Sequence, residues 1–186
     1  KISVRIALGL VATLILFLLS IYAGAWGKVP SKKELSEFNY QRASEVYSAD
    51  SILIGKYYLF DRQPISYNDL PQHLVDALVA IEDERFYGHN GIDYPSLFRV
   101  LFKTILLQDQ SAGGGSTLTQ QLAKNLYPRV SNGKVRLAVD KVKEMMVASR
   151  LEDLYTKEEL LTLYLNTVSF GDNTFGIESA SLKFFN

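Results

Sequence analysis

The chain has 186 residues, enough for one folded domain of ordinary size with an appended segment. Its 20 Lys and Arg balance its 20 Asp and Glu, so charge gives no reason to expect nucleic-acid binding. It has no cysteine and two histidines, His73 and His89, which excludes disulfide bonds, a thiol nucleophile and a His-rich metal centre.

The N-terminal region contains a candidate membrane anchor. Ile6 to Trp26 is a run of 21 residues without Asp, Glu, Lys, Arg or His. At about 1.5 Å per residue, a helix of this length reaches roughly 30 Å, the thickness of the hydrocarbon core of a bilayer. Ala23-Gly24-Ala25 also fits the cleavage site of a signal peptide, although the apolar run is long for that alternative. We therefore predict a transmembrane anchor over 1–26.

Two short regions follow the predicted anchor. Residues 27–42 are polar, which predicts a tether with little core of its own. Residues 43–60 contain two runs typical of strands, Ser44–Tyr47 and Ile52–Phe60, which predict a small β-hairpin.

From residue 69 onward the apolar pattern is helical almost throughout. Leu74, Ala77, Leu78 and Ile81 are spaced i, i+3, i+4, i+7 and predict a buried stripe on a first helix. Further helices are predicted over 93–108, 117–127 and 134–154, and from 156 onward. The fold class is therefore mainly α, in a domain over 43–186 with its helical part over 69–186. Because the chain stops in an apolar helical pattern, we expect this domain to be truncated at its C-terminus.

Two details refine these helices. Thr117-x-x-Gln120 and Thr156-x-x-Glu159 both have the capping-box pattern of a helix start. On the helix over 134–154, the predicted buried side chains are Val135, Ala138, Val139, Val142, Met145 and Met146.

The first candidate site lies at the end of the first helix, where Glu82 and Asp83 are adjacent. Acidic residues at a helix C-terminus oppose the macrodipole, so folding gives no evident reason for them. A carboxylate in a partly desolvated cleft would have a raised pKa and could serve as a general base. A solvated helix end is the alternative, and His89 alone suits a structural hydrogen bond.

The second candidate site is a glycine run, Gly113 to Gly115, that leads into a helix. Backbone N–H groups at such a helix start can face an anion. Ser116, Thr117, Gln120 and Gln121 add hydroxyls and amides, and Lys124 lies further along the helix. The Gly-Lys-Ser/Thr of a nucleotide-binding P-loop is absent, and a flexible loop before a capped helix is the alternative.

The third candidate cluster is Arg136, Asp140, Lys141 and Glu144. Arg136, Asp140 and Glu144 are spaced i, i+4, i+8 and share a helix face. An exposed, salt-bridged stripe explains these residues equally well.

Taken in chain order, the clusters resemble a known family. The motifs are Glu82-Asp83-x-x-Phe86-x-x-His89-x-Gly91, Gly114-Gly115-Ser116-Thr117-x-Thr119-Gln120-Gln121, Lys141-x-x-Glu144, Tyr164-x-Asn166 with Phe170-Gly171, and Gly176-Ile177-Glu178-x-Ala180. They are similar to glycosyltransferase family 51, the peptidoglycan glycosyltransferases of monofunctional enzymes and class A penicillin-binding proteins. The resemblance covers about 69–186 and implies a lysozyme-like helical domain.

The resemblance also implies an activity and roles. The reaction is polymerisation of lipid II into β-1,4 glycan with inversion and release of undecaprenyl diphosphate. Glu82 matches the general base and Glu144 the second glutamate, while Lys124 and Arg136 match cations that receive the diphosphate. The implied substrate-binding set is Asp83, Ser116, Thr117, Gln120, Gln121, Lys124, Arg136 and Lys141. The chain departs from the family at Asp140, where the third motif usually has Arg.

Cofactor, partner and location expectations follow from this resemblance. No obligatory cofactor or metal site is expected, although Mg or Mn could assist at the diphosphate. The implied partners are lipid II, a lipid-linked glycan chain, the membrane and cell-wall synthesis machinery, with no nucleic acid. Lys and Arg flank both ends of the anchor, so the outer face of the bacterial cytoplasmic membrane is implied by the substrate alone. The apolar stretch Leu97–Leu107 suits either a helix in the bilayer interface or an ordinary buried helix.

Two other functions remain open. A lysozyme-like glycan-cleaving enzyme would also use glutamates on glycan. An inactive, membrane-tethered scaffold that binds lipid II is the other, and the departure at Asp140 is its only support.

Overall fold

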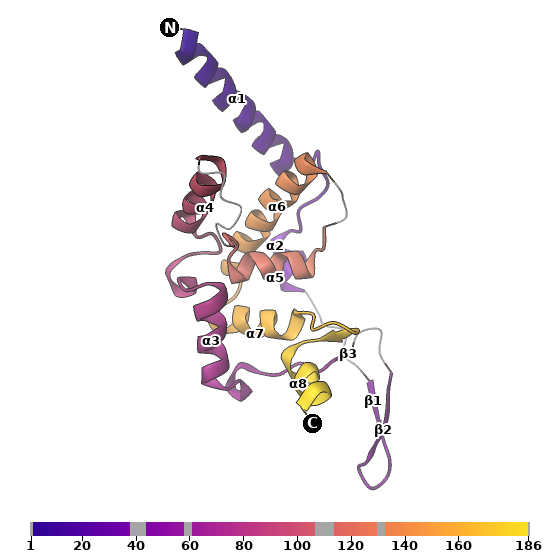
Figure 1. Cartoon of the computed structure of the whole chain (residues 1–186). Coiled ribbons are helices and arrows are strands. Elements are labelled where there is room, and N and C mark those ends of the chain that lie inside the picture. Colours follow the sequence, from indigo (N-terminus) through magenta and orange to yellow (C-terminus); the bar gives the residue numbers. More distant parts are fainter. Residues whose placement is uncertain (1, 38–43, 58–60, 107–113, 130–132, 186) are drawn as a thin grey trace.

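A computed structural model describes residues 2–37, 44–57, 61–106, 114–129 and 133–185 of the chain. Its first helix, α1 (Ile2–Tyr22), projects from the body of the molecule (Figure 1). Ser3–Tyr22 is long and apolar enough to cross a membrane, and only 6% of its most apolar window is buried. Exposed apolar side chains along a whole helix are stable in lipid rather than in water. The helix therefore fits the predicted anchor.

Residues 27–37, which follow α1, pack on the helical domain. Leu35, on the short helix α2 (Lys32–Ser36), is 1% exposed and belongs to the hydrophobic core. Lys143 donates a hydrogen bond to the carbonyl of Trp26, and Arg150 donates to the carbonyls of Val29 and Pro30. The stretch predicted as a tether with little core of its own is thus packed on the domain over its described part. The polar composition of this stretch did not predict its packing, which depends on one buried leucine and on backbone carbonyls that accept hydrogen bonds.

The β-structure is limited and lies to one side of the helices. β1 (Ser44–Tyr47) pairs antiparallel with β2 (Leu53–Tyr57), and this predicted hairpin extends away from the helical body (Figure 1). β3 (Asp61–Arg62) pairs in parallel with β4 (Thr174–Phe175), joining the two ends of the helical region.

Helices build the rest of the domain. They are the one-turn helices η1 (Tyr67–Asp69) and η2 (Phe86–Gly88), and α3 (Gln72–Glu82), α4 (Tyr94–Leu106), α5 (Leu118–Leu126), α6 (Lys134–Glu152), α7 (Lys157–Thr167) and α8 (Ile177–Phe185). α5 lies against both α6 and α7 (Figure 1), and their facing side chains form much of the core. The predicted mainly α-helical domain is confirmed. The predicted end of α4 beyond 106 lies outside the described residues.

Several sequence-based details are wrong. Ala77 on α3 is exposed, and Ile81 is 80% exposed, because the last turn of α3 lies along a groove rather than over the core. Ala138 is exposed and Val135 is 59% exposed, because the buried face of α6 begins only at Val139. Thr117 accepts a hydrogen bond from the Gln120 amide, but no reciprocal capping bond is present, since the Gln120 side chain bonds elsewhere. The capping box at Thr156 is complete.

The packing of Leu35 can be tested by stability. We expect Leu35→Ala to lower the free energy of unfolding by about 2–4 kcal/mol, because it leaves a cavity in the core. Val135→Ala, on the exposed start of α6, should change it by less than about 0.5 kcal/mol. Chemical denaturation in detergent measures both, and equal effects would contradict a structural role for residues 27–37.

Candidate active site

The first motif is built around the buried carboxylate of Asp83. Its Oδ2 accepts a hydrogen bond of 2.9 Å from the backbone N–H of Leu118, the first residue of α5. His89 Nε2 lies 3.0 Å from its Oδ1, and the side chains of Asp83 and His89 are both buried. A carboxylate at a helix N-terminus is favoured by the macrodipole and by the free amides there. The sequence-based view that folding does not require this acidic pair is therefore wrong for Asp83.

The glycine that ends the first motif permits close packing. Gly91 has φ +80°, and a Cβ at this position would lie 2.9 Å from a backbone carbon of Ala148 on α6. Its carbonyl accepts hydrogen bonds from Thr117 Oγ1 (2.7 Å) and Gln120 Nε2 (3.2 Å). The backbone turn at Gly91 thus fixes the start of α5 against the first motif.

Glu82 is exposed at the end of α3 and is positioned by α5. Gln121 Nε2 donates a hydrogen bond of 2.8 Å to Glu82 Oε2, and Gln121 Oε1 accepts one of 3.1 Å from the Tyr164 hydroxyl. Burial, together with the negative charge of Glu82, raises the pKa of Tyr164. Tyr164 therefore stays protonated as a donor and fixes the orientation of the Gln121 amide. Glu82 is therefore exposed and held by a hydrogen bond, whereas the sequence predicted a partly desolvated position.

Glu144 lies at the centre of a cluster of charged side chains. Arg129 Nε and Nη2 bond its two oxygens at 2.7 and 3.1 Å. Lys141 Nζ lies 3.5 Å from Glu144 Oε2 and donates a hydrogen bond of 2.6 Å to Ser116 Oγ. Burial lowers the pKa of Lys141, more than the nearby Glu144 raises it. The second and third motifs are therefore in direct contact.

One groove joins these groups. It has a volume of about 370 Å³ and is lined by Ile81, Glu82, Gly114, Ser116, Gln120, Gln121, Lys124, Arg129 and Glu144. The two glutamates, the exposed Lys124 and Arg129 thus border the same space. A carboxylate beside a wall of hydroxyls and amides can remove a proton from a sugar hydroxyl, and nearby cations can stabilise an anionic group that departs.

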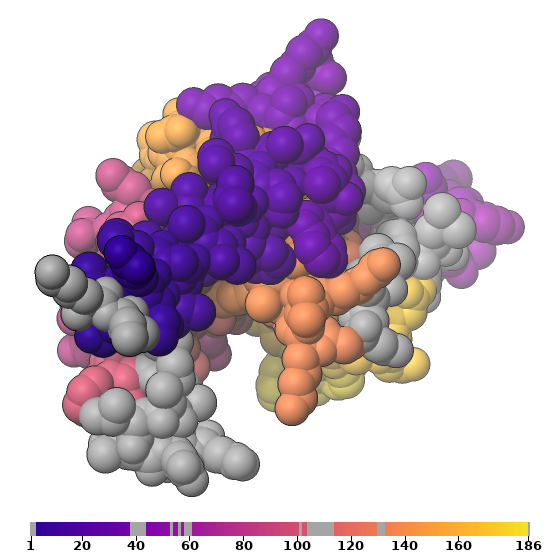
Figure 2. Space-filling model, turned by 90° about the horizontal axis from the view of Figure 1, so that it is seen from above, coloured from indigo at the N-terminus to yellow at the C-terminus, as the bar shows by residue number. Residues whose placement is uncertain are grey.

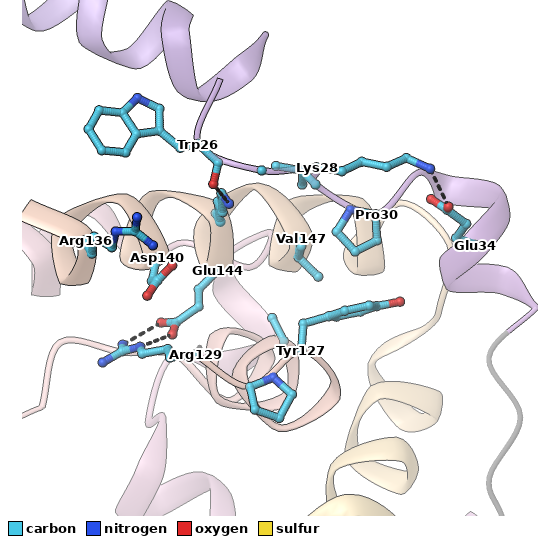
Figure 3. A pocket seen from close by; sticks show the side chains of 15 residues that line it. Trp26, Lys28, Pro30, Glu34, Tyr127, Arg129, Arg136, Asp140, Glu144 and Val147 are labelled. Carbon is cyan, nitrogen blue, oxygen red and sulfur yellow. Dashed lines mark hydrogen bonds and ion pairs between the residues drawn. The ribbon is translucent and has the colours of Figure 1, made fainter. Parts of the chain in front are cut away.

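A second hollow, the anchor-side cavity, adjoins the chain directly after α1 (Figure 3). Its volume is about 640 Å³, and its walls come from Trp26–Pro30, the end of α5 and one face of α6. Arg129 and Glu144 border both the anchor-side cavity and the groove. Viewed from the α1 side, the N-terminal residues lie across this face of the domain (Figure 2).

The predicted site residues separate into three groups in the structure. The groove contains Glu82, Glu144, Ser116, Gln121 and Lys124, and Lys141 reaches Ser116 at its wall. Asp83, Thr117 and Gln120 are buried, and their side chains bond protein groups that hold α5 in place, although Gln120 also borders the groove. Arg136 borders the anchor-side cavity rather than the groove.

Arg129 is the site residue that the sequence did not indicate. It follows α5 in a segment where the helical pattern breaks, so no spacing relates it to Glu144. Among the described residues, no group of three His, Cys, Asp or Glu side chains lies close enough together to hold a metal ion.

Comparison with known proteins places the chain in a family. Residues 50–186 match the sequence model described as Transglycosylase, so the chain belongs to the transglycosylase family, as its motifs predicted. It is 39% identical over 144 residues to penicillin-binding protein 1F of Bacillus subtilis, covering 77% of this chain and 20% of that protein. It is 35% identical over 158 residues to penicillin-binding protein 1A of Escherichia coli, covering 85% and 18%.

A shorter relative matches the same region. The chain is 41% identical over 121 residues to a monofunctional glycosyltransferase of Staphylococcus aureus, covering 65% of this chain and 43% of that protein. The matched region thus spans about a fifth of the two penicillin-binding proteins and less than half of the monofunctional glycosyltransferase.

The turn at Gly91 gives a test of the site's framework. We expect Gly91→Ala to destabilise the domain by about 2–4 kcal/mol, because alanine meets both a positive φ and the backbone of Ala148. Gly88→Ala is the matched control, since nothing lies within 4 Å of a Cβ there. Thermal unfolding compares the two, and equal stability of both variants would refute the close packing of Gly91 on α6.

Proposed function

We propose that the chain is a peptidoglycan glycosyltransferase that polymerises lipid II into β-1,4 glycan strands. The donor is a glycan chain on undecaprenyl diphosphate, and the acceptor is the 4-hydroxyl of a lipid II sugar. The observation that carries the proposal is the groove that brings Glu82, Lys124, Arg129 and Glu144 together. Membership of the transglycosylase family supports the same reaction class.

The proposed reaction assigns the proton and the leaving group to opposite parts of the groove. Glu82 removes the proton of the acceptor hydroxyl as the new bond forms to the anomeric carbon of the donor. The bond from that carbon to the diphosphate breaks, and the leaving oxygen takes its electron pair. Attack from the face opposite the diphosphate inverts the anomeric centre. Lys124 stabilises the departing diphosphate electrostatically.

The remaining polar residues position the substrates. Glu144 orients the cations beside it, because Arg129 and Lys141 both contact its carboxylate. Ser116 lines the sugar and phosphate path in this proposal, Gln121 holds Glu82, and the buried Gln120 supports the wall from behind through Gly91. A divalent cation on the diphosphate would add positive charge, and the proposal makes no step depend on it.

The domain is proposed to act at the outer face of the cytoplasmic membrane. Besides α1, α4 has an exposed aromatic stripe of Tyr94, Phe98 and Phe102 at i, i+4, i+8 spacing. An exposed apolar stripe on an amphipathic helix suits the bilayer interface. This favours the interfacial alternative for this helix over an ordinary buried one. Lipid II and the lipid-linked glycan would then reach the groove from the membrane.

The charge of the groove favours transfer from a diphosphate over the two other functions. A glycan-cleaving enzyme needs two carboxyl groups but no cluster of cations at the leaving group. An inactive scaffold would not need Glu82 to be held by Gln121 and Tyr164. Cell-wall synthesis proteins are proposed partners on the basis of family membership alone.

The role of Glu82 predicts a large loss on removal of its charge. We expect Glu82→Gln to lower the rate of lipid II polymerisation by at least about 100-fold, because an amide cannot accept the proton. Glu84→Gln removes a neighbouring exposed carboxylate and should change the rate by less than twofold. Gel analysis of labelled lipid II measures both. Polymerisation by Glu82→Gln at the parent rate would overturn the proposal, and cleavage of purified glycan strands by the parent would favour the hydrolase.

The pKa of Lys141 predicts a pH dependence. Since burial lowers its pKa, Lys141 loses its positive charge at a lower pH than an ordinary lysine, and we expect kcat/KM to fall at alkaline pH as that charge is lost. Lys141→Arg should move this fall to higher pH, because arginine stays charged. Lys134→Arg, an exposed change on α6, should leave the profile in place. Superimposable profiles for Lys141→Arg and the parent would refute a required charge on Lys141.

A further inference from the structure

Arg129 lies where the groove meets the anchor-side cavity. Its guanidinium bonds both oxygens of Glu144, and this ion pair borders the two spaces at once. The Glu144 side chain is 7% exposed and that of Arg129 is 32% exposed. The pair is therefore fixed at its acidic end and open to ligands at its basic end.

With respect to the residues that the structure describes, the guanidinium has donors left for a ligand. An arginine side chain carries five N–H groups, and Glu144 is bonded by two of the Arg129 nitrogens. The remaining N–H groups lie on the other edges of a planar fork, which matches phosphate oxygens well. Glu144 and Asp140 also raise the pKa of Arg129, so its charge does not depend on pH in any working range.

Two carboxylates of α6 oppose an anionic ligand unless cations lie beside them. Asp140 and Glu144 lie on the same side of α6, toward Arg129 (Figure 3). Arg136 borders the anchor-side cavity beside Asp140, whereas Arg129 is bonded to both oxygens of Glu144. Lys124 adds positive charge in the groove. Loss of Arg129 would remove a positive charge beside the Glu144 carboxylate, which disfavours a diphosphate there.

The two spaces also fit the two ends of a lipid-linked donor. The anchor-side cavity lies directly after the membrane helix, and its lining includes the apolar Val29, Pro30 and Val147 as well as charged residues such as Arg136 and Lys143. The groove has Glu82 and a polar wall. A diphosphate on Arg129 would place its polyprenyl chain toward the anchor and its sugar toward Glu82.

We propose that Arg129 binds the diphosphate of the lipid-linked donor and replaces the arginine that the family motif usually has at position 140. This rests on the proposed function. As the bond from the anomeric carbon to the diphosphate oxygen breaks, the electron pair stays with the diphosphate. Arg129 donates hydrogen bonds to its non-bridging oxygens, while the acceptor proton goes to Glu82. The third motif thus keeps its cation, supplied from the segment before α6.

The single tryptophan gives a direct binding assay. Trp26 borders the anchor-side cavity, so its fluorescence reports ligands that enter beside Arg129. The full chain in detergent micelles is titrated with undecaprenyl diphosphate and, separately, with undecaprenyl monophosphate. We expect Arg129→Gln to weaken diphosphate binding at least about tenfold and monophosphate binding less, because fewer phosphate oxygens lose a partner. Lys134→Gln, which removes an exposed cation on α6, should bind both ligands like the parent.

Two further variants separate charge from structure. Arg129→Lys keeps a cation beside Glu144 but not the planar fork, and should weaken diphosphate binding a few-fold even if Arg129→Gln does not fold. Adding Asp140→Arg to Arg129→Gln should restore most of the diphosphate affinity and of the polymerisation rate. Parent-like diphosphate binding in folded Arg129→Gln, or an equal loss for both ligands without rescue by Asp140→Arg, would overturn the proposal.

The binding assay is independent of turnover. A parent chain that binds undecaprenyl diphosphate through Arg129 but does not polymerise lipid II would contradict the proposed function and support the role of Arg129. If the parent chain polymerises lipid II and the Arg129→Gln variant keeps the parent's rate and diphosphate affinity, the result would support the proposed function and contradict the role of Arg129.

Discussion

The hydrogen bonds of Asp83 are the constraint on which the rest of the site depends. This buried carboxylate joins the end of α3 to the first amide of α5 and to His89. Because Glu82 precedes it, the same contact sets Glu82 beside Gln121 on α5. The Gly91 turn then holds α5 against α6, which carries Glu144. One charged capping interaction therefore positions both glutamates relative to each other.

Charge in the groove is balanced rather than simply positive. Glu144 is buried, and a buried carboxylate is stable only with partners, which Arg129 and Lys141 provide. The same cations are then held at the place where a diphosphate would leave. Because position 140 is acidic, part of the positive charge beside Glu144 comes from Arg129, which lies before α6. A substitution of Arg129 would therefore alter the site without changing either glutamate.

Features that depend on residues close together in the sequence were predicted correctly. The apolar run, the hairpin, the helices and the capping box at Thr156 follow from periodicity and spacing. The positions that were not predicted depend on contacts distant in sequence. Asp83 opposes its own helix dipole but caps another helix, and Ile81 fits a helical stripe but lines the groove. Arg129 reaches Glu144 from a non-helical segment, where no periodicity could reveal it.

Donor and acceptor are proposed to bind in one groove, between Glu82 and the cations Lys124 and Arg129. A crystal structure of the Glu82→Gln variant with bound lipid II would show this arrangement. We expect the sugar 4-hydroxyl within hydrogen-bonding distance of residue 82 and a diphosphate in contact with Lys124 and Arg129. A diphosphate bound outside the groove, or an acceptor hydroxyl facing Glu144 instead, would contradict the proposed arrangement.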